Sequence, residues 1–591
     1  MRYSELLADW LLELGYTHCF FVAGGNIMHL LASVSKRFTC IPVVHEVTAG
    51  IAAEYFNESS DAGRAFALVT AGPGLTNIVT AIAGAWLESR ELLVLGGQVK
   101  TEDLSRGELR QRGIQEINGV DIVKPVTVRS VLMDRVLGQA EFAQIIRAGS
   151  MGRKGPVFLE IPLDIQGREV ARTVQDGFAV SESDFIVPVL GDEKINQLLA
   201  AIRSASRPVL LIGGGVKRET MRRLYDALAG TGIPLMTTWN GADRISADHP
   251  LYFGRPNTWG QRYSNLLLQQ ADLLVALGTR LGMQQTGFNW QEFIPVGKLI
   301  QIDCDRSELE KGHPKVDVPL QGDANAVIEA IAVAELGDHH DWINYCRMVK
   351  TELPIVEPIN QTGSDYLSPY IFAQQLSLLC GNDDVVIPCS SGSAFTVMMQ
   401  AFVQKRGQLM VTNKGLASMG YGLGGAIGAA FAHPDRRVVL VEGDGGFSQN
   451  LQELGTAAVN NLNLKIFIFD DNGYASIRMT QRNYFGGSYV GCDRATGLGV
   501  PNWGKLFDAY DIPVMRLQPG FETDERFLSQ FNSKGVVGFI VQIDPEQTYF
   551  PKITSRVTET GSMASNPLHL MTPDLDQATK LKVCRFLERL S

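Results

Sequence analysis

Two apolar runs that end in glycine and acidic residues constrain the fold of this chain more than any other feature. The run that starts at Val439 leads into Gly443-Asp444-Gly445, and the run 466–469 ends at Asp470-Asp471-Asn472-Gly473. Residues 449–460, about one helix of sequence, lie between them. Runs this short and this apolar are typical of strands buried on both faces of a parallel sheet. We therefore expect two neighbouring parallel strands whose carboxyl ends share the edge at which open α/β sheets bind ligands.

The side chains expected at this edge predict a magnesium site. Asp444 and the loop 471–473 would bring carboxylate and carbonyl oxygens together. Proteins usually hold Mg²⁺ through one or two carboxylates, while a phosphate group supplies further oxygen ligands. The sequence thus predicts a clamp for a metal ion and a diphosphate. The alternative is that Asp470 and Asp471 are solvated turn residues.

Length, charge and apolar patterning exclude several classes of protein. A chain of 591 residues with 45% hydrophobic content is too long for one core and predicts three domains. Its net charge of -10 argues against a nucleic-acid partner or an anionic membrane surface. No uninterrupted apolar run is long enough to predict a transmembrane helix. Residues 1–10 carry acidic residues within an apolar pattern and predict an amphipathic helix, not a signal peptide.

The cysteines predict buried free thiols. The eight cysteines are scattered without a Cys-x-x-Cys pair, and Cys19, Cys304 and Cys389 stand in apolar runs. Because the nine histidines are dispersed as well, neither a zinc site nor a nucleophilic cysteine is expected. Free thiols of this kind are typical of a reducing compartment, so a cytoplasmic enzyme is expected.

Alternating apolar strands and helices predict an α/β protein with three doubly wound parallel-sheet domains. The predicted domains cover residues 1–172, 190–345 and 365–550, and a tail covers 551–591. The polar segment 173–183 separates the first two domains, and 352–364, with two prolines, predicts a linker before the third. Strands are expected at 17–22, 40–44, 65–70, 92–95, 157–161, 207–215, 234–237, 273–277, 299–302 and 385–388, and helices at 48–55, 370–379 and 574–590.

Four further motifs accompany the Gly-Asp-Gly motif. Glu46 ends an apolar strand before a helix of small residues, and residues 70–77 form a glycine turn before another helix. Residues 155–164 predict a closing strand, and 418–422 read Ser-Met-Gly-Tyr-Gly. In this order the motifs resemble the thiamine diphosphate (ThDP) enzymes of the acetolactate synthase-like family. The resemblance implies ThDP and Mg²⁺ as cofactors, bound by a first, pyrimidine-binding domain and a third, diphosphate-binding domain that are distant duplicates.

The resemblance gives Glu46 the catalytic role. In this family a glutamate forms a hydrogen bond with the aminopyrimidine ring of the cofactor and so promotes removal of the thiazolium proton. A charge-assisted bond of this kind is strong in a dry site. The alternative is that Glu46 only stabilises the start of the following helix, where acidic residues are favoured.

Other residues are implied to bind the cofactor. Met419 matches the residue that holds the cofactor in a bent shape, although on composition alone it would be an ordinary core methionine. Gln115 stands where related enzymes place a loop of the partner subunit near the cofactor; the alternative is a surface loop. The cofactor-binding residues implied in this way are Gly24, Gly25, Glu46, Thr70, Pro73, Asn77, Gln115, Ser390, Ser391, Ser418, Met419, Gly443, Asp444, Gly445, Gly446, Asp471, Gly473, Tyr474 and Ala475.

The metal motif departs from the family pattern. Where an Asn-Asn pair is usual, this chain has Asp470-Asp471. Alignment on the following residues makes Asp444 and Asp471 the side-chain ligands and Gly473 a carbonyl ligand, with Asn472 as the alternative. A second carboxylate about 5 Å from another acid costs about 3 kcal/mol at an effective dielectric near 20, which attraction to a divalent ion exceeds.

The second domain resembles the flavin-binding middle domain of acetohydroxyacid synthases. Glycine-rich strand ends can hold a phosphate through backbone N–H groups, and an arginine can bind it as well. A domain without a nucleotide is the alternative, and the pattern is not the dinucleotide fingerprint that would indicate NAD. The FAD-binding residues implied are Gly213, Gly214, Gly278, Thr279, Arg280, Asp303 and Asp323.

The resemblance implies decarboxylation of pyruvate or a similar 2-oxo acid and transfer of its two-carbon unit to a carbonyl acceptor. A nucleotide-linked keto-sugar is favoured as acceptor, because Arg478, Gln481 and Arg482 suit a polar or phosphorylated molecule and 285–289 resembles flavoproteins that make branched sugars. Arg478 and Arg482 as plain surface charges are the alternative. The rival functions are an acetolactate synthase with pyruvate as acceptor, a simple decarboxylase or oxidase, and a catalytically silent regulatory homologue. A homodimer or homotetramer with active sites at the subunit interface is expected.

Overall fold

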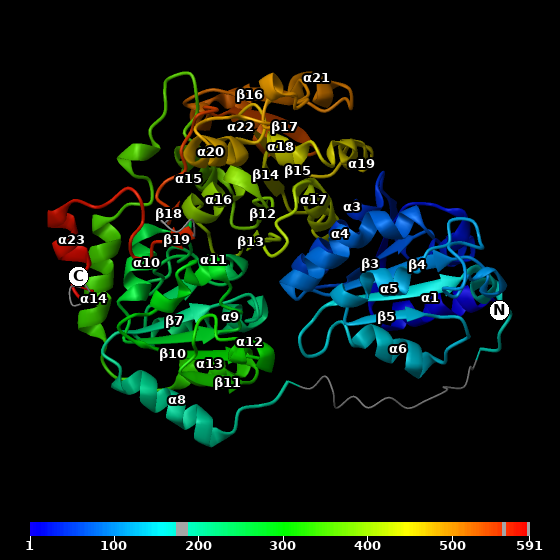
Figure 1. Cartoon of the computed structure of the whole chain (residues 1–591), viewed down its shortest axis with the longest axis horizontal. Coiled ribbons are helices and arrows are strands. Elements are labelled where there is room, and N and C mark those ends of the chain that lie inside the picture. Colours follow the sequence, from blue (N-terminus) through cyan, green and yellow to red (C-terminus); the bar gives the residue numbers. More distant parts are fainter. Residues whose placement is uncertain (173–186, 558–562, 588–591) are drawn as a thin grey trace. The chain divides into compact units, whose positions relative to one another are not determined.

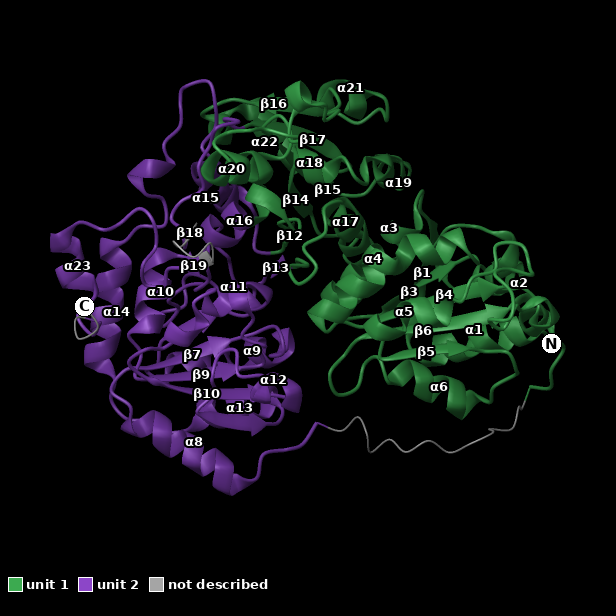
Figure 2. Cartoon of the chain, viewed as in Figure 1, with its two compact units in different colours: residues 1–186, 383–395, 411–542 green, residues 187–382, 396–410, 543–591 purple. Residues whose placement is uncertain are grey.

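The computed structural model describes residues 1–172, 187–557 and 563–587 (Figure 1). The predicted separator 173–183 lies outside the described residues. Three parallel sheets flanked by helices are present, so the predicted α/β class with three parallel-sheet domains is confirmed. By packing, the chain divides into two compact units: residues 1–186, 383–395 and 411–542, and residues 187–382, 396–410 and 543–591 (Figure 2).

The first sheet has the strand order β2-β1-β3-β4-β6-β5, with all pairs parallel. Every residue of β4 and β6 is buried, as expected for central strands covered by helices on both faces. Its strands are β1 (Tyr16–Phe21), β2 (Thr39–Pro42), β3 (Arg64–Val69), β4 (Leu92–Gln98), β5 (Arg129–Leu132) and β6 (Pro156–Pro162). Its helices are α1 (Tyr3–Glu13), α2 (Met28–Val34), α3 (Glu46–Ser59), α4 (Pro73–Glu88), α5 (Gly119–Val123), α6 (Gln139–Arg147) and α7 (Leu163–Gly167).

The same unit contains the strand order β12-β14-β15-β17-β16, again parallel. These strands are β12 (Val385–Ile387), β14 (Val438–Gly443), β15 (Leu464–Asp470), β16 (Val514–Leu517) and β17 (Val537–Gln542). The helices around them are α17 (Tyr421–Ala432), α18 (Asp444–Phe447), α19 (Leu454–Val459), α20 (Ala475–Tyr484), α21 (Trp503–Asp508) and α22 (Glu525–Asn532). Since β14 and β15 are direct neighbours, their carboxyl ends adjoin as the sequence predicted.

Within this unit α3 packs along α17. Glycines allow the close approach: a Cβ atom at Gly428 would lie 2.1 Å from the carbonyl oxygen of Ala52, and one at Gly425 would lie 2.6 Å from the ring of Tyr55. A buried polar network joins the two helices. Glu54 on α3 accepts hydrogen bonds from Tyr421 (2.6 Å) and Arg90 (2.9 Å). All three side chains are buried, and the two bonds to Glu54 fix how the helices sit on each other.

The second unit is built on the parallel order β11-β10-β9-β7-β8. Apolar side chains on both faces of β7 and β9 form its core. The strands of this sheet are β7 (Pro208–Ile212), β8 (Leu235–Thr237), β9 (Leu273–Leu277), β10 (Lys298–Asp303) and β11 (Val318–Gln321). The unit also contains β13 (Leu409–Met410) and an antiparallel pair, β18 (Ser555–Val557) and β19 (Met563–Ser565). The helices are α8 (Asp192–Ser204), α9 (Arg218–Ala229), α10 (Arg262–Gln269), α11 (Met283–Thr286), α12 (Arg306–Glu310), α13 (Ala324–Val333), α14 (His340–Glu352), α15 (Pro369–Leu379) and α23 (Gln577–Val583). Of α16 (Gly392–Ala401), residues 392–395 are assigned to the first unit and 396–401 to the second.

The expected strands are confirmed to within a few residues, but two helix predictions are wrong in extent. Residues 449–460 do not form one helix; a short 3-10 turn (Leu451–Glu453) precedes α19. The Asn450 side chain donates to the carbonyl oxygen of Gly420 (2.7 Å), and this tertiary bond replaces helical packing at that point. In the tail, α23 covers Gln577–Val583 where 574–590 was expected, and 588–590 lie outside the described residues.

Two further sequence predictions concern the chain as a whole. All eight cysteines are free, and five of them, including Cys19 and Cys389, are buried as predicted. The prediction is wrong for Cys304, which is partly exposed, as are Cys40 and Cys584. Among the described residues, no helix combines the length and the apolar character needed to cross a bilayer.

Candidate functional site

The residues predicted in the first domain gather at the carboxyl edge of its sheet. Gly24 and Gly25 follow β1, Glu46 follows β2, and Thr70 follows β3. The turn after β3 is tight, since Gly72 has φ +67° and a Cβ atom there would lie 2.5 Å from the carbonyl oxygen of Gln115. Gln115 itself has φ +64°, which is strained for a residue with a side chain. The structure therefore brings the glycine turn and the Gln115 loop together at this edge.

Glu46 is the first residue of α3 and is 8% exposed. Its Oε2 accepts a hydrogen bond from Nδ2 of Asn77 (3.0 Å), a residue of α4 that was predicted for the same site. The backbone before it is held from the third domain, because Oε1 of Glu453 accepts the N–H groups of Val44 (3.2 Å) and His45 (3.0 Å). Glu453 is fully buried, and sequence reasoning missed it because it is some 400 residues away along the chain. The arrangement gives Glu46 one defined orientation.

Two buried acids hold the segment that carries Gln115. Glu116 accepts hydrogen bonds from the N–H groups of Arg112 (2.8 Å) and Gly113 (3.2 Å). Glu160, at the carboxyl end of β6, receives hydrogen bonds from the N–H groups of Gly119 and Val120 and from the Gln98 side chain. Burial raises the pKa of Glu160 to about 7, although these hydrogen bonds lower it.

We predict that Glu160→Gln removes a pH-dependent loss of stability. The unfolded carboxyl group releases its proton near 4.5 and the folded one near 7, so the folded state holds more protons between these values. Its free energy of unfolding therefore falls by about 3 kcal/mol as pH rises through this window. The melting temperature of Glu160→Gln should exceed that of the wild type more at pH 8 than at pH 5. The exposed Glu102→Gln should show no such widening; an equal gap at both pH values would contradict the prediction.

Asp444 and Asp471 lie together at the carboxyl edge of the third sheet. Asp444 is fully buried, and its Oδ2 accepts the N–H group of Gly473 (2.9 Å). Asp471 is 2% exposed and its side chain contacts the Asp444 carboxyl group. Burial raises the pKa of Asp444 to about 7, and burial together with the charge of Asp444 raises the pKa of Asp471 well above its usual range. Two facing, buried carboxyl groups are costly to ionise unless a cation lies between them.

This edge fits a magnesium ion. Within the described residues, Oδ1 of Asp471 accepts no hydrogen bond, so a buried carboxylate oxygen is left for a ligand. Asn472 is exposed, with φ +68°, whereas Asp471 points toward Asp444. The described chain contains no cluster of three or more His, Cys, Asp or Glu side chains that could hold a metal. Two carboxylates suffice for Mg²⁺ when phosphate oxygens complete its ligands.

The segment around Met419 adjoins this edge. The Ser390 hydroxyl group, which follows β12, donates to the carbonyl oxygen of Ser418, and Asn450 binds the carbonyl of Gly420. Met419 itself is 36% exposed. It is therefore not the core methionine of the alternative interpretation, and its apolar side chain is free to contact a bound molecule. The Gly443 Cα faces open space, while a Cβ atom at Gly445 would lie 2.3 Å from the Tyr474 ring.

The residues implied to bind flavin lie at the carboxyl edge of the second sheet. Gly213 and Gly278 follow β7 and β9 and pack on each other, since a Cβ atom at Gly213 would lie 2.2 Å from the carbonyl oxygen of Gly278. Asp323 accepts the N–H group of Asn325 (2.9 Å) and caps α13, and Asp303 accepts that of Asp305 (2.9 Å). Gly214, Thr279 and Arg280 stand at the same edge, and Arg280 is partly exposed. Close packing and helix capping thus account for several of these residues without a nucleotide.

Two residues assigned to a phosphorylated acceptor are engaged elsewhere. Arg478 is 3% exposed and donates to the carbonyl oxygens of Asp471 (2.6 Å) and Asn472 (3.2 Å). The Gln481 amide group forms two hydrogen bonds with the backbone of Val490 (3.1 and 3.0 Å). The interpretation of Arg478 as a surface charge is therefore wrong, and its role as an acceptor ligand loses its support.

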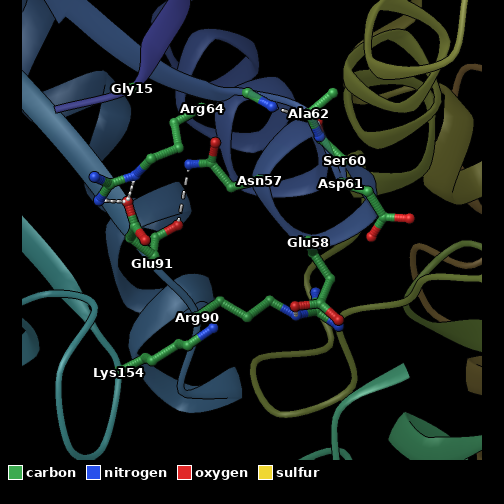
Figure 3. Close-up of a pocket in the computed structure, with 11 residues that line it drawn as sticks. Gly15, Asn57, Glu58, Ser60, Asp61, Ala62, Arg64, Arg90, Glu91 and Lys154 are labelled. Carbon is green, nitrogen blue, oxygen red and sulfur yellow. Dashed lines mark hydrogen bonds and ion pairs between the residues drawn. The ribbon is translucent and has the colours of Figure 1, made fainter. Parts of the chain in front are cut away.

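A cavity of about 400 Å³ lies in the first domain, away from these edges (Figure 3). Its lining residues stand at the amino ends of β1, β3, β4 and β6, whereas the site residues stand at carboxyl ends. Arg64 pairs with Glu91, and Arg90 lies 3.7 Å from Glu58, so the charges in its wall largely offset each other. The cavity is not part of the candidate site.

Comparisons with known proteins agree with this geometry. Three family models match: the thiamine pyrophosphate enzyme N-terminal TPP binding domain over residues 1–122, the central domain over 195–331 and the C-terminal TPP binding domain over 390–541. The large subunit of acetolactate synthase isozyme 1 from Escherichia coli is 29% identical over 93% of this chain and 95% of its own length. The acetolactate synthase large subunit from Corynebacterium glutamicum is 30% identical over 88% and 82%, and acetolactate synthase 1 from Zea mays is 27% identical over 93% and 87%. With these matches over most of its length, the chain belongs to the thiamine pyrophosphate enzymes and is an acetolactate synthase-like, ThDP-dependent member of that family.

Proposed function

We propose that this enzyme decarboxylates pyruvate or a close 2-oxo acid and joins the remaining two-carbon unit to the carbonyl group of a second 2-oxo acid. The observation that carries the proposal is a buried, oriented Glu46 at the edge of the first sheet together with a buried carboxylate pair, Asp444 and Asp471, at the edge of the third sheet. When bound, ThDP supplies a nucleophilic carbon and an electron sink for such chemistry.

The residues of this chain divide the remaining tasks. Glu46, held by Asn77, would exchange a proton with the pyrimidine ring of the cofactor. Asp444, Asp471 and the carbonyl of Gly473 would hold Mg²⁺ and through it the diphosphate. The exposed Met419 side chain would support the cofactor from its apolar side. The remaining implied residues, Gly24, Gly25, Thr70, Pro73, Gln115, Ser390, Ser391, Ser418, Gly443, Gly445, Gly446, Tyr474 and Ala475, would line the cofactor site.

The choice of a 2-oxo acid acceptor revises the keto-sugar hypothesis. Arg478 and Gln481 bind backbone groups of their own domain, so two of the three side chains that favoured a phosphorylated acceptor are occupied. Gln285 and Asn289, from the segment that resembles sugar-modifying enzymes, likewise bond to Pro256 (2.6 Å) and Glu292 (2.8 Å). The relatives that match over most of the chain are acetolactate synthases.

Product analysis tests the proposal. The purified protein with ThDP, Mg²⁺ and pyruvate should release CO₂ and form acetolactate, detected by mass spectrometry. Aldehyde in place of acetolactate would indicate a simple decarboxylase, and no CO₂ would indicate a silent homologue. A new branched product only after addition of a nucleotide keto-sugar would restore the original choice of acceptor.

For the middle domain we propose that Arg280 and the N–H groups of Gly214 and Thr279 hold the phosphates of FAD. The protein as purified should then show flavin absorbance in the visible spectrum. Arg280→Met should lower the flavin content, whereas Arg306→Met, which removes an exposed cation in the same domain, should not. A colourless wild-type protein that binds no added FAD would contradict the proposal.

A further inference from the structure

The guanidinium group of Arg478 donates hydrogen bonds to two successive carbonyl groups of the loop that carries the metal-site residues. Arg478 is the fourth residue of α20 and, although cationic, is 3% exposed. Its Nη2 donates to the carbonyl oxygen of Asp471 (2.6 Å) and its Nη1 to that of Asn472 (3.2 Å). Planar guanidinium groups are suited to holding two acceptors at once, which a lysine cannot reproduce. Arg478 thus fixes two successive peptide groups of the loop.

The loop needs such support because its backbone is strained. Asn472 has φ +68° and Gly473 has φ +122°, so the chain reverses sharply right after the two carbonyls that Arg478 holds. Residues other than glycine rarely adopt this region and keep it only when neighbouring contacts enforce it. The reversal directs the Gly473 N–H group to Asp444 (2.9 Å) and the Tyr474 N–H group to the carbonyl of Cys492 (2.8 Å).

If Arg478 acted through its charge alone, it would weaken metal binding, whereas a role in shaping the loop would strengthen it. Nη2 lies 3.8 Å from Oδ1 of Asp471, and Asp444 and Asp493 are further acids that interact with Arg478. A cation beside a metal-binding carboxylate competes with the metal, so by Coulomb's law its removal should tighten metal binding. A role in shaping the loop predicts weaker binding instead. The sign of the effect therefore separates the two roles.

We propose that Arg478 is a positioning residue of the metal site: its hold on the carbonyls of Asp471 and Asn472 places the Asp471 carboxylate and the Gly473 backbone beside Asp444. The inference rests on the proposed function, because it presupposes that this loop binds Mg²⁺. It also accounts for a second carboxylate at a position where the family usually has asparagine, since the arginine charge offsets the added negative charge.

The test measures how ThDP binding to the full-length protein depends on Mg²⁺, by titration calorimetry. Arg478→Met should raise the Mg²⁺ concentration that half-saturates ThDP binding by about 10- to 100-fold, the usual effect of losing a partner that orients a metal ligand. Excess Mg²⁺ should restore binding, and Arg478→Lys should fall between the two proteins. A half-saturating concentration that is unchanged or lower would overturn the proposal.

Three controls make the result specific. Arg526→Met removes an exposed cation of the same domain and should leave the Mg²⁺ requirement unchanged. If Arg478→Met fails to fold, Asp471→Asn is compared with Asp471→Asn/Arg478→Met, in which the Asp471 carboxylate no longer stands buried without the arginine. The double variant should still need about tenfold more Mg²⁺ than the single one, and equality would refute positioning. If ThDP binding to the wild type does not depend on Mg²⁺, the proposed function fails; if wild type and Arg478→Met depend on it equally, only this inference fails.

Discussion

Glu46→Gln binds ThDP and Mg²⁺ as the wild type does but releases CO₂ from pyruvate about 10² to 10⁴ times more slowly; this is the expected result if Glu46 is the acid-base group. Glutamine is nearly isosteric and can still accept the hydrogen bond that Asn77 donates (3.0 Å), so the local structure should persist. What the amide cannot do is exchange a proton at this position. Steady-state kinetics with calorimetric measurement of ThDP affinity therefore separates chemistry from binding.

The alternative role of Glu46, stabilising the start of α3, predicts a different outcome. Loss of an acidic charge from the first turn of a helix costs about 0.3–1 kcal/mol and leaves the rate unchanged. Glu219, an exposed acid in the first turn of α9, offers a matched control in the other unit. Glu219→Gln should change the melting temperature no more than Glu46→Gln does, with full activity. Near-wild-type turnover by Glu46→Gln would remove this residue from the mechanism.

Strands that form continuous apolar runs are predictable from sequence, whereas the short edge strands β5 and β11 are not. β7, β9, the first four residues of β14 and residues 466–469 of β15 are continuous apolar runs because helices cover both faces of the sheet. β5 and β11 stand at sheet edges, are four residues long and include polar or proline residues that are partly or fully exposed. Such segments lack the apolar signal because their pairing depends on a neighbour already in place.

Only those site residues that directly follow a predicted strand could be placed from the sequence. Parallel strands bring their carboxyl ends to one edge, so Asp444 and Asp471 could be placed together from sequence order alone. Glu453 and Arg478 form hydrogen bonds with backbone groups of other segments, and no local sequence pattern predicts these bonds. Glu453 reads as a polar residue after a loop, yet its carboxylate holds the peptide groups just before Glu46. From sequence alone, Arg478 would be a surface or ligand-binding cation. In the structure its side chain is 3% exposed and donates hydrogen bonds to two backbone carbonyl groups.

Asp444→Ala should abolish Mg²⁺-dependent ThDP binding. Asp444 faces Asp471 and fixes Gly473, so its removal deletes one metal ligand and frees the loop that carries the others. Because loss of a supporting residue alone weakens metal binding about 10- to 100-fold, loss of a ligand should exceed that range. Calorimetry measures the loss. Asp470→Ala, one residue before Asp471 and 19% exposed in its side chain, is the control and should retain binding.

Mixing Asp444→Ala with Glu46→Gln then tests whether two subunits share each active site. Within one chain α3, which begins at Glu46, packs along α17, whereas the family resemblance implies that each cofactor lies between the first domain of one copy and the third domain of another. If so, a dimer with one subunit of each variant has one site with both changes and one with neither. Random reassociation would make half of the dimers mixed, so about a quarter of wild-type activity should return although each variant alone is inactive. If tagged subunits exchange but no activity returns, Glu46 and Asp444 of one chain serve the same site.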